Sequence, residues 1–499
     1  MCKSIMIQGT ASHVGKSIVV TALCRIFSDM GVKVAPFKAQ NMALNSFITK
    51  DGKEIGRAQA VQAEAARIDP CVEMNPILLK PTTDLGSQVI FMGRPVGNAK
   101  AREYYAMKER ALDVIREAYE SLCERFDLIV LEGAGSPAEI NLAEQDIVNM
   151  RMAELADAPV ILVSDIDRGG VFASLIGTMT LLPDQQRERV RGFLINKFRG
   201  DRSLLAPGLK QIEERTGKPV FGVLPYIRDL RIEQEDSVAL SEKKSRSMEP
   251  DGKVRVGVVR LPRLSNYTDL DPLEGDPGMD VIYVDDKETI RGLDVVIIPG
   301  SKDTIGDLRY LKETGMAHAI CDYSNNGGQV IGLCGGFQML GKTIEDPHGV
   351  ESAKSAEAGL GLLPVETVLE REKVTAQVQA VSMDGLTNLT GYEIHMGKSI
   401  RLNGCSGMFR ITKRNGRSVD EEDGAQSPKG NVWGTYIHGI FENAPIRRRL
   451  LDSIRKGHHA CSSELTDYHE LKSREFARLA GLFREYVDMD AILQAAGLG

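Results

Sequence analysis

Short apolar runs recur through the first half of the chain, and most precede a stretch whose apolar residues return every three or four positions. Short apolar runs are typical of buried parallel strands, and the longer period is typical of helices packed on them. The alternation predicts an α/β domain with a doubly wound parallel sheet. The predicted strands lie at residues 5–7, 32–37, 128–131, 159–164, 193–195 and 220–224, and the predicted helices at 18–27, 57–67 and 104–122.

The second half repeats this alternation and predicts a second doubly wound domain. Between the halves lies a charged stretch with few apolar residues, which is typical of an exposed linker. The end of the chain has helical periodicity, and we expect it to form a short helical tail that packs on the second domain. The predicted boundaries are 1–232 for the first domain, 233–252 for the linker, 253–445 for the second domain and 446–499 for the tail.

Length, charge and cysteine content narrow the class of protein. A chain of 499 residues exceeds what one core supports, which agrees with two or more domains. The net charge of −7, with both signs mixed along the chain, argues against a nucleic-acid partner. No apolar run approaches the length of a membrane span, so we expect no membrane partner. The chain starts with the first predicted strand, so we expect no signal peptide. Eight cysteines without a C-x-x-C pair are typical of reduced thiols, so we expect a cytoplasmic protein.

The first predicted strand leads into a glycine-rich loop that ends in Gly-Lys-Ser, and a helix follows. In such a loop, glycines such as Gly9 and Gly15 let backbone N–H groups, including that of Thr10, close on phosphate oxygens. Lys16 would reach the β- and γ-phosphates, and the Ser17 hydroxyl would ligate Mg²⁺. Five residues separate the two glycines where the common pattern has four. The sequence predicts an ATP site here, and the alternative is a chance glycine-rich turn.

Polar residues stand at the ends of other strands of the first half, where a parallel sheet binds its ligands. Glu132 ends one buried run and is a candidate second Mg²⁺ ligand; the alternative is an acidic residue that starts an exposed turn. Lys38 follows the second strand and faces the same crevice. Asn196 and Lys197, with Asp201 nearby, are similar to a loop that recognises a nucleotide base, although the aspartate is too late for guanine specificity. A plain connecting loop is the alternative for these residues.

In the second half, an apolar strand leads into Cys334, and a helix follows. Glycines at 332, 335 and 336 flank the cysteine, as in a nucleophile elbow, because only small neighbours permit this turn. The helix N-terminus lowers a thiol pKa, which favours the reactive thiolate. The N–H of Gly335, together with the backbone near Gly300, would form an oxyanion hole. The alternative is a buried structural cysteine.

A catalytic thiol needs a base, and the sequence offers several histidines. His438 follows a strand-like run, where it would face the elbow. His395 is the competing candidate, whereas His458 and His459 lie among charged residues and are expected to be solvated. Ile440 stands two residues after His438, and the first acidic residue beyond it, Glu442, comes two positions later. Either the pair acts as a dyad, or another carboxylate orients the histidine.

Together these motifs resemble the cobyric acid synthase family of cobalamin biosynthesis. The resemblance rests on the loop at 9–17, the Glu-Gly-Ala-Gly strand end at 132–135, the elbow at Cys334 and the segment Thr-Tyr-Ile-His-Gly at 435–439. The first half is also similar to dethiobiotin synthetase, whose loop has the same five-residue spacing, and the second to class I glutamine amidotransferases. The stretch 391–397 (GYEIHMG) also resembles the glutaminase half of this family.

The resemblance implies a P-loop synthetase domain followed by a glutaminase domain. Cys334 would release ammonia from glutamine with His438 as base, and ATP with Mg²⁺ would activate a corrinoid carboxylate. The substrate would be adenosylcobyrinic acid a,c-diamide, amidated at carboxylates b, d, e and g. Lys38 would face the substrate or a phosphate. No tightly bound cofactor is implied, because the corrinoid is the substrate.

Rivals are the sister a,c-diamide synthase and a partition-type ATPase switch, which carries an extra lysine early in its loop. This loop has none, and the elbow would then have no purpose.

Overall fold

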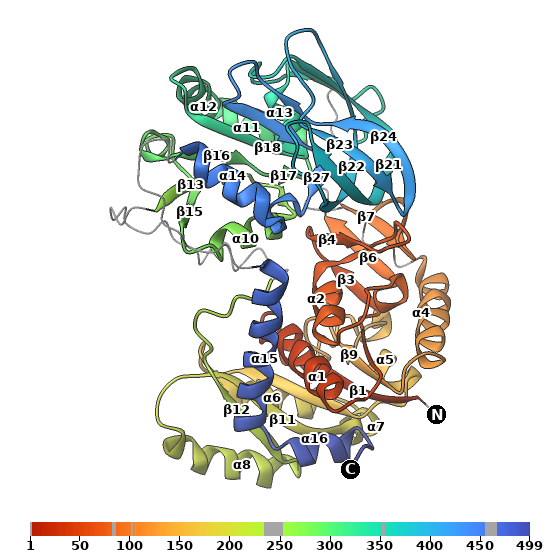
Figure 1. Cartoon of the computed structure of the whole chain (residues 1–499). Coiled ribbons are helices and arrows are strands. Elements are labelled where there is room, and N and C mark those ends of the chain that lie inside the picture. Colours follow the sequence, from red (N-terminus) through yellow and green to blue (C-terminus); the bar gives the residue numbers. More distant parts are fainter. Residues whose placement is uncertain are drawn as a thin grey trace. The chain divides into compact units, whose positions relative to one another are not determined.

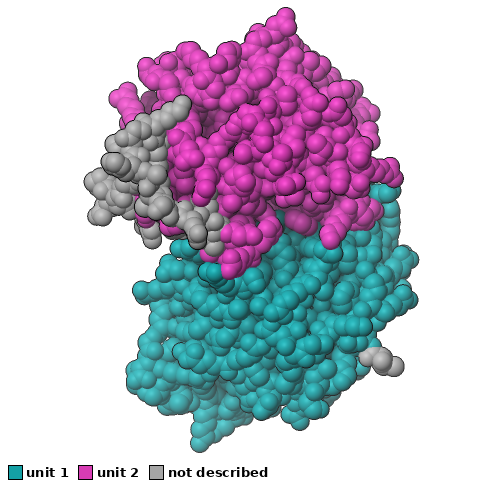
Figure 2. All heavy atoms as spheres, viewed as in Figure 1, with its two compact units in different colours: residues 1–43, 54–233, 472–499 teal, residues 44–53, 234–471 magenta. Residues whose placement is uncertain are grey.

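The computed structural model describes residues 2–81, 86–100, 103–104, 106–233, 253–351, 355–454 and 467–499. The chain divides into two compact units, which Figure 1 shows as a ribbon and Figure 2 in two colours. Unit 1 comprises residues 1–43, 54–233 and 472–499, and unit 2 comprises residues 44–53 and 234–471. The units interleave along the sequence. Residues 44–53 of unit 2 lie between two segments of unit 1, and residues 472–499 of unit 1 follow the last segment of unit 2.

A six-stranded parallel sheet forms the centre of unit 1, as the apolar runs predict. Its order is β12-β11-β10-β1-β9-β2, so the strand before the glycine-rich loop lies in the middle. Both faces are covered by helices, and every residue of β9 is buried. The strands are β1 (Lys3–Gly9), β2 (Val34–Phe37), β9 (Leu128–Glu132), β10 (Val160–Asp165), β11 (Val190–Phe198) and β12 (Val220–Pro225).

The helices of unit 1 divide between the two faces of this sheet. Apolar side chains of α1, α2, α15 and α16 pack on one face, and those of α4, α5, α6 and α8 pack on the other. This two-sided cover is the doubly wound arrangement. The helices are α1 (Lys16–Asp29), α2 (Arg57–Ala65), α4 (Lys108–Cys123), α5 (Met150–Leu155), α6 (Val171–Leu181), α7 (Asp184–Arg189), α8 (Ala206–Thr216), α15 (Tyr468–Tyr486) and α16 (Met489–Ala495), with 3₁₀ turns η1 (Val72–Met74), η2 (Ala143–Gln145) and η3 (Arg202–Leu205).

A second, four-stranded sheet in unit 1 was not predicted from the sequence. Its order is β3-β6-β7-β8, with β3 and β6 parallel and the other pairs antiparallel. All but one residue of β8 are exposed, so this strand has no apolar pattern that would reveal it. The strands are β3 (Gln40–Met42), β6 (Ile77–Pro81), β7 (Gly86–Phe91) and β8 (Arg94–Lys100), and the short β5 (Glu54–Gly56) precedes α2.

The two last helices of the chain pack on unit 1, so the expectation that the whole tail packs on the second domain was wrong. Phe476, Leu479 and Phe483 of α15 join the buried cluster formed by β1 and α1. The turn between α15 and α16 extends this contact, because the N–H of Asp488 donates to the carbonyl of Phe221 in the edge strand β12 at 2.7 Å. Helical periodicity shows that a helix has a face to bury but does not identify the surface that covers it.

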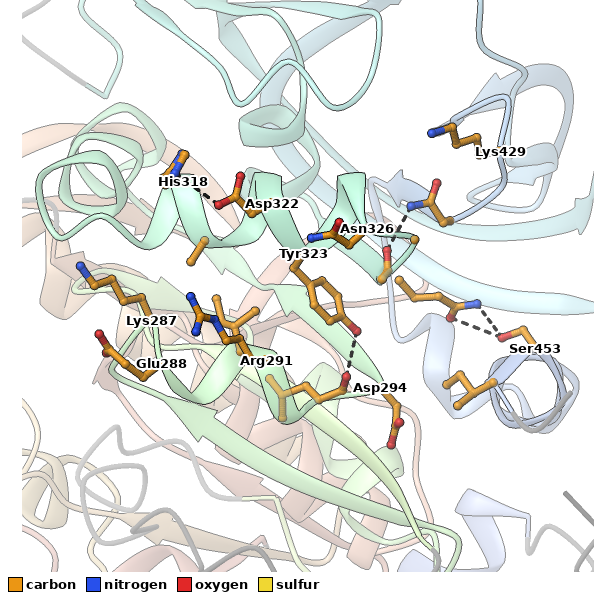
Figure 3. A pocket seen from close by; sticks show the side chains of 18 of the residues that line it. Lys287, Glu288, Arg291, Asp294, His318, Asp322, Tyr323, Asn326, Lys429 and Ser453 are labelled. Carbon is orange, nitrogen blue, oxygen red and sulfur yellow. Dashed lines mark hydrogen bonds and ion pairs between the residues drawn. The ribbon is translucent and has the colours of Figure 1, made fainter. Parts of the chain in front are cut away.

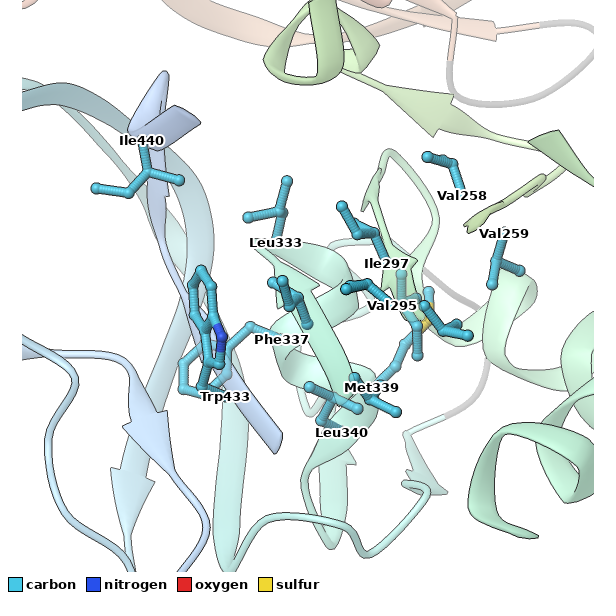
Figure 4. Close-up of a cluster of buried hydrophobic side chains, with 14 of the residues drawn as sticks. Val258, Val259, Val295, Ile297, Leu333, Phe337, Met339, Leu340, Trp433 and Ile440 are labelled. Atoms are coloured by element: carbon cyan, nitrogen blue, oxygen red, sulfur yellow. The ribbon is translucent and has the colours of Figure 1, made fainter. Parts of the chain in front are cut away.

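Unit 2 is built on a second six-stranded sheet, in the order β15-β13-β16-β18-β26-β25. All its neighbouring pairs are parallel except β25 and β26. Figure 4 shows part of its apolar core, in which Leu333, Phe337 and Trp433 lie near the strand that precedes Cys334. The strands are β13 (Val254–Val259), β15 (Met279–Val284), β16 (Val295–Ile298), β18 (Gln329–Leu333), β25 (Ala425–Gln426) and β26 (Val432–Thr435).

Short helices and turns connect these strands. Helix α14 packs its residues Ile446, Leu450 and Leu451 into the core of unit 2, so the first part of the predicted tail does lie on the second domain. The elements are η4 (Tyr267–Leu270), α10 (Asp271–Glu274), η5 (Thr289–Gly292), α11 (Thr304–Glu313), α12 (Met316–Asn325), α13 (Gly335–Leu340), η6 (Ile440–Glu442) and α14 (Ala444–Ile454).

A largely antiparallel sheet of seven strands flanks this core. Its main path is β20-β19-β21-β22-β27, and β23 and β24 extend it from β21. The sequence analysis did not predict the long strands, although burial alternates along much of β21. The strands are β19 (Thr343–Glu345), β20 (Ala356–Ala358), β21 (Val365–Ser382), β22 (Leu389–Arg401), β23 (Phe409–Arg414), β24 (Arg417–Asp423) and β27 (Ile437–His438), and the short β4 (Ser46–Ile48), β14 (Leu264–Ser265) and β17 (Gly300–Ser301) also belong to unit 2.

Some predicted features fall on residues that the structure does not describe. Most of the predicted linker, from residue 234 to 252, lies outside the described residues, as do His458 and His459. Residue Glu233 is buried and forms an ion pair with Arg57 in unit 1. Within the described stretches, no helix has both the length and the apolar composition that a bilayer crossing requires.

The packing of α15 predicts that Phe483→Ala destabilises unit 1. The side chain is fully buried, and removing a buried aromatic ring costs about 3–5 kcal/mol of unfolding free energy. Hydrogen exchange measured by mass spectrometry should become faster in peptides from β1 and α1. Fluorescence of Trp433, the single tryptophan, which lies in unit 2, should stay unchanged. Ser473→Ala, on the exposed face of the same helix, is the control, and equal protection in both variants would contradict the observed packing.

Candidate active sites

The glycine-rich loop of unit 1 wraps around the amino group of Lys16. This side chain is buried, and its Nζ donates to the carbonyls of Ala11 at 2.9 Å and Gly135 at 3.1 Å. Thr10 joins the loop to the neighbouring strand, because its N–H donates to the carbonyl of Val163. The loop therefore holds a buried ammonium group beside the N-terminus of α1, which suits a phosphate group.

Both glycines of the loop are required by the backbone. Gly15 has a φ of 101°, in the left-handed region, and a Cβ there would collide with the side-chain amide of Asn196. A Cβ on Gly9 would lie 2.6 Å from a methyl group of Val14 and 3.0 Å from Lys16 Nζ. A side chain at Gly9 would crowd the Lys16 amino group, and one at Gly15 would displace Asn196 from the loop, so only glycine suits these positions of the cradle.

The carboxylate of Glu132 is the centre of the polar cluster beside this loop. One oxygen accepts from Ser17 Oγ at 2.9 Å and from Lys38 Nζ at 2.8 Å, and the other accepts from Gln62 Nε2 at 2.5 Å. Burial by itself would raise the pKa of Glu132, but Lys38, Gln62 and Ser17 together hold it below its usual value. The structure thus brings together three predicted site residues, Ser17, Lys38 and Glu132, around an ionised carboxylate.

Two residues near the end of β11, Asn196 and Lys197, support the loop. Asn196 is buried, and its Nδ2 donates to the carbonyl of Val14 at 2.9 Å. Lys197 has a φ of 62°, and its Nζ donates to the carbonyl of His13 at 2.8 Å and pairs with Asp165. The side-chain contacts described here hold the phosphate loop, and a contact of Asn196 with a nucleotide stays a prediction.

In unit 2, Cys334 occupies a strained turn between β18 and α13. Its φ of 50° and ψ of −105° lie far from strand and helix values, as a nucleophile elbow requires. Steric crowding excludes a side chain at the flanking glycines. A Cβ on Gly332 would lie 2.7 Å from the backbone of Gly336, and a Cβ on Gly335 would lie 2.9 Å from the backbone nitrogen of Ser301.

Two backbone segments meet beside the thiol, as the predicted oxyanion hole requires. Gly335 opens α13, so its N–H belongs to the first turn, whose N–H groups have no acceptor within the helix. Gly300 lies in the short strand β17, and a Cβ there would lie 2.9 Å from the carbonyl of Ser265 and 3.6 Å from His438 Cε1. Their roles in holding an oxyanion stay predictions.

The imidazole of His438 is buried between the thiol and a carboxylate. Its Nδ1 lies 2.6 Å from Asp269 Oδ2, and the other oxygen of Asp269 accepts from the N–H of Gly439 at 2.8 Å. Its Nε2 lies 3.4 Å from Asn266 Nδ2, and Cys334 is within hydrogen-bonding reach. The unit therefore contains a Cys–His–Asp arrangement, in which Asp269 orients the histidine.

This carboxylate comes from a part of the chain that sequence reasoning did not consider. Asp269 lies in η4, before the elbow in chain order, whereas the usual triad carboxylate follows the histidine by two residues. Glu442 was the nearest acidic residue in the sequence, but chain distance does not indicate which carboxylate reaches an imidazole. Asn266 and Gln62 were also missed, and neither lies in a motif that would have indicated it.

Burial by itself would lower the pKa of His438, but Asp269 and Cys334 raise it to about 10. The folded protein therefore favours the imidazolium form of His438. The usual pKa of histidine is 6.5. The stabilisation that this charge contributes is complete below pH 6.5 and is lost as the pH rises towards 10.

The competing histidine, His395, is held differently. Its Nδ1 donates to the carbonyl of Gly397 at 2.8 Å, and its ring stacks on Tyr436 with centroids 3.9 Å apart. The neighbouring carbonyl, that of Ile394, accepts from Cys334 Sγ at 3.6 Å. The stretch 391–397 therefore lines the thiol site. His395 Nε2 lies 3.7 Å from Glu393 Oε1, whereas His438 has the closer carboxylate, Asp269, at 2.6 Å. The catalytic roles of both histidines stay predictions.

A cavity of about 1210 Å³ opens elsewhere on unit 2. Figure 3 shows that side chains of both charges line it, including Lys287, Arg291 and Asp322. Gln329, the first residue of β18, also lines it, whereas Cys334 follows the other end of that strand. The cavity therefore lies at the N-terminal end of β18, and the Cys334 thiol lies at the other end, outside the cavity.

Comparison with known proteins agrees with this pair of sites. Residues 5–238 match the CobQ/CobB/MinD/ParA nucleotide binding domain, and residues 255–446 match the CobB/CobQ-like glutamine amidotransferase domain. The chain thus combines a nucleotide-binding domain with a glutamine amidotransferase domain.

Full-length relatives give the particular family. Cobyric acid synthase of Syntrophobacter fumaroxidans is 50% identical over 510 residues, with 99% of each chain covered. That of Caldanaerobacter subterraneus subsp. tengcongensis is also 50% identical and covers 99% of this chain and 98% of its own, and that of Sorangium cellulosum is 49% identical with 99% of each chain covered. The chain belongs to the cobyric acid synthase family.

The contact between Asp269 and His438 predicts the effect of Asp269→Asn. Without the carboxylate, the pKa of His438 falls, so less of the imidazolium is present to favour ionisation of the catalytic thiol. Glutamine hydrolysis should decrease roughly 10²- to 10⁴-fold, and the pH at which iodoacetamide alkylates Cys334 at half its maximal rate should rise. Asp322→Asn, which removes the carboxylate of the exposed pair His318–Asp322, is the matched control. Unchanged alkylation in Asp269→Asn would show that another group orients His438.

Proposed function

We propose that this protein converts adenosylcobyrinic acid a,c-diamide into adenosylcobyric acid. Carboxylates b, d, e and g become amides at the expense of ATP, and glutamine supplies the nitrogen. The observation that carries the proposal is similarity over the whole chain to cobyric acid synthases. Each unit also contains a cluster of polar side chains that suits one half-reaction. The sister a,c-diamide synthase and the partition-type ATPase are less well supported, because the full-length relatives quoted above carry the cobyric acid synthase name.

The glutaminase reaction follows from the arrangement around Cys334. The thiolate attacks the side-chain carboxamide of glutamine, and the carbonyl oxygen takes the charge, held by the N–H of Gly335 and the backbone near Gly300. The imidazolium of His438 gives its proton to the nitrogen as the carbon–nitrogen bond breaks. Ammonia leaves, and a γ-glutamyl thioester remains. Water, activated by the neutral imidazole, then hydrolyses the thioester to glutamate and restores the thiolate.

The synthetase reaction follows from the cradle in unit 1. An oxygen of the corrinoid carboxylate attacks the γ-phosphorus of ATP, ADP leaves, and an acyl phosphate forms. Ammonia then attacks the acyl carbon, and inorganic phosphate leaves as the amide forms. Lys16 and the loop N–H groups offset the negative charge on the phosphoryl oxygens. Lys38 follows β2, at the same end of the parallel sheet as the phosphate loop, and is proposed to face the substrate.

The residues beside the loop also fit Mg²⁺. Ser17 and Glu132 place two oxygen donors together, the carboxylate is ionised, and Mg²⁺ prefers such ligands. When bound, the ion would neutralise charge on the phosphates. ATP and Mg²⁺ are the only additions that we propose, with no tightly bound cofactor.

We also propose that the protein works in the cytoplasm. The seven cysteines among the described residues are all free, which suits a reducing compartment. Neither a nucleic acid nor a membrane is proposed as a partner.

The proposal predicts a separation of the two half-reactions. With ATP, Mg²⁺ and adenosylcobyrinic acid a,c-diamide, the wild type should form the amides with glutamine or with ammonium. Cys334→Ala should form them with ammonium alone, because the synthetase site is intact. Lys16→Ala should form none with either nitrogen source but should still hydrolyse glutamine. Mass spectrometry of the corrinoid measures the amides, and release of glutamate measures the glutaminase.

Two outcomes would contradict the proposal. If the wild type leaves the corrinoid unchanged with both nitrogen sources, the substrate assignment is wrong. If Cys334→Ala retains the use of glutamine, the assignment of the nucleophile is wrong. His438→Ala should behave as Cys334→Ala does, and loss of ammonium-dependent synthesis in this variant would indicate a structural role for the histidine.

A further inference from the structure

Residues 44–53 belong to unit 2, although the residues on both sides of them belong to unit 1. The segment lies within the part of the chain that matches the nucleotide-binding domain, whereas the glutamine amidotransferase match begins only at residue 255. Asn45, Ser46, Ile48 and Thr49 are each at most 1% exposed. A short segment from the first half of the sequence is thus a buried part of the glutaminase unit.

The segment holds the loop that carries the histidine's partner. Asn45 Oδ1 accepts from the N–H of Tyr267 at 3.1 Å, and the N–H of Ser46 donates to Asn266 Oδ1 at 3.1 Å. Tyr267 is the first residue of η4, the 3₁₀ turn that contains Asp269. Asn266 has a φ of 52°, in the left-handed region, which asparagine adopts more readily than most residues other than glycine.

The same segment contacts the ring that covers His438. Tyr392 stacks on the imidazole with centroids 5.3 Å apart, and its hydroxyl donates to the carbonyl of Ser46 at 3.3 Å. The ring of Phe47 lies 5.6 Å from that of Tyr392. Ile48 packs with Tyr392 and with Ile394, whose carbonyl accepts from the thiol of Cys334.

The rest of the segment is anchored on β21, whose Gln377 and Thr375 pair with Tyr392 and Ile394 of β22. Gln377 of β21 donates to the carbonyl of Ile48, and Thr375 Oγ1 donates to the carbonyl of Gly52 at 2.8 Å. These contacts fix the segment on the antiparallel sheet.

We propose that residues 44–48 form a positioning segment for the glutaminase, in which Asn45 and Phe47 hold η4 and Tyr392 so that Asp269 and His438 keep their contact. The segment acts through these groups and does not touch the reacting atoms. Its preceding residues belong to unit 1, and Lys38 stands seven positions before Asn45. The nucleotide-binding half of the chain therefore supplies part of the support of the glutaminase histidine. This inference rests on the proposed roles of Cys334 and His438.

The test uses the pH profile of Cys334 alkylation by iodoacetamide in the full-length protein. In Asn45→Ala the N–H of Tyr267 loses its acceptor, so η4 loosens and Asp269 supports the imidazolium less well. The midpoint of the profile should rise by about one pH unit, and glutamine hydrolysis should fall about tenfold, the usual effect of one lost buried hydrogen bond. Phe47→Ala should shift the midpoint in the same direction.

Two further variants separate positioning from general loosening. Thr375→Val removes a hydrogen bond from the other end of the segment and should leave the midpoint unchanged. Asn45→Ala combined with Asp269→Asn should shift it no further than Asp269→Asn alone, because both changes act on one contact. Trp433 fluorescence reports whether unit 2 remains folded in each variant.

The outcomes are distinct. Wild-type profiles in both Asn45→Ala and Phe47→Ala would overturn the inference, as would an equal shift in Thr375→Val. If instead the wild-type Cys334 is not selectively alkylated, the proposed glutaminase chemistry fails. Corrinoid amidation is not needed for this measurement, so an error in the proposed substrate would leave its result unaffected.

Discussion

A buried carboxylate must be paired, and both sites of this chain are arranged around one. Glu132 and Asp269 are each at most 3% exposed, and each accepts hydrogen bonds at both of its oxygens. Removing one partner of such a pair typically costs 3–5 kcal/mol, because the remaining charge is left without compensation. This cost holds Lys38 beside the phosphate loop and His438 beside the thiol, and it therefore fixes the two groups on which the proposed chemistry depends.

Backbone crowding is the second constraint, and it acts at both turns that end a central strand. Gly15 takes a left-handed conformation against Asn196, and Gly332, Gly335 and Gly336 let α13 approach the neighbouring strand ends closely. A side chain at Gly15 would collide with Asn196, and one at Gly332, Gly335 or Gly336 would force α13 away from the strand ends beside it. The N-terminal end of each helix, with its partial positive charge, is thus brought to the place where a phosphate or a thiolate is expected.

The interleaving of the units gives this chain a property that neither half has alone. The glutaminase unit includes residues 44–53, and the nucleotide-binding unit includes the last helices of the chain. The two sequence halves therefore do not correspond to two independent structural parts. Asn45 contributes to the surroundings of His438, and Phe483 contributes to the core under the phosphate loop.

Much of the fold and several candidate residues of both sites could be predicted from local patterns. The apolar runs before Gly9 and Cys334 predict parallel strands, and the glycines after them predict turns with bound groups. The four-stranded sheet that contains β8 could not be predicted, because an exposed strand has no apolar alternation. The partner of the tail was also mispredicted, since the periodicity of α15 is the same whichever core covers it.

The sequence by itself determined the two α/β domains, the phosphate loop with Lys16, the nucleophile elbow at Cys334 and the family to which they point. These features depend on residues that are neighbours in the chain, so their spacing is visible in a single sequence. Only the tertiary structure decided that Asp269 orients His438, that Gln62 completes the surroundings of Glu132 and that Asn45 supports the glutaminase. Those contacts join residues separated by 169, 70 and 222 positions. Such pairs have no local spacing to recognise, and they form only when the packing of the sheets brings the residues together.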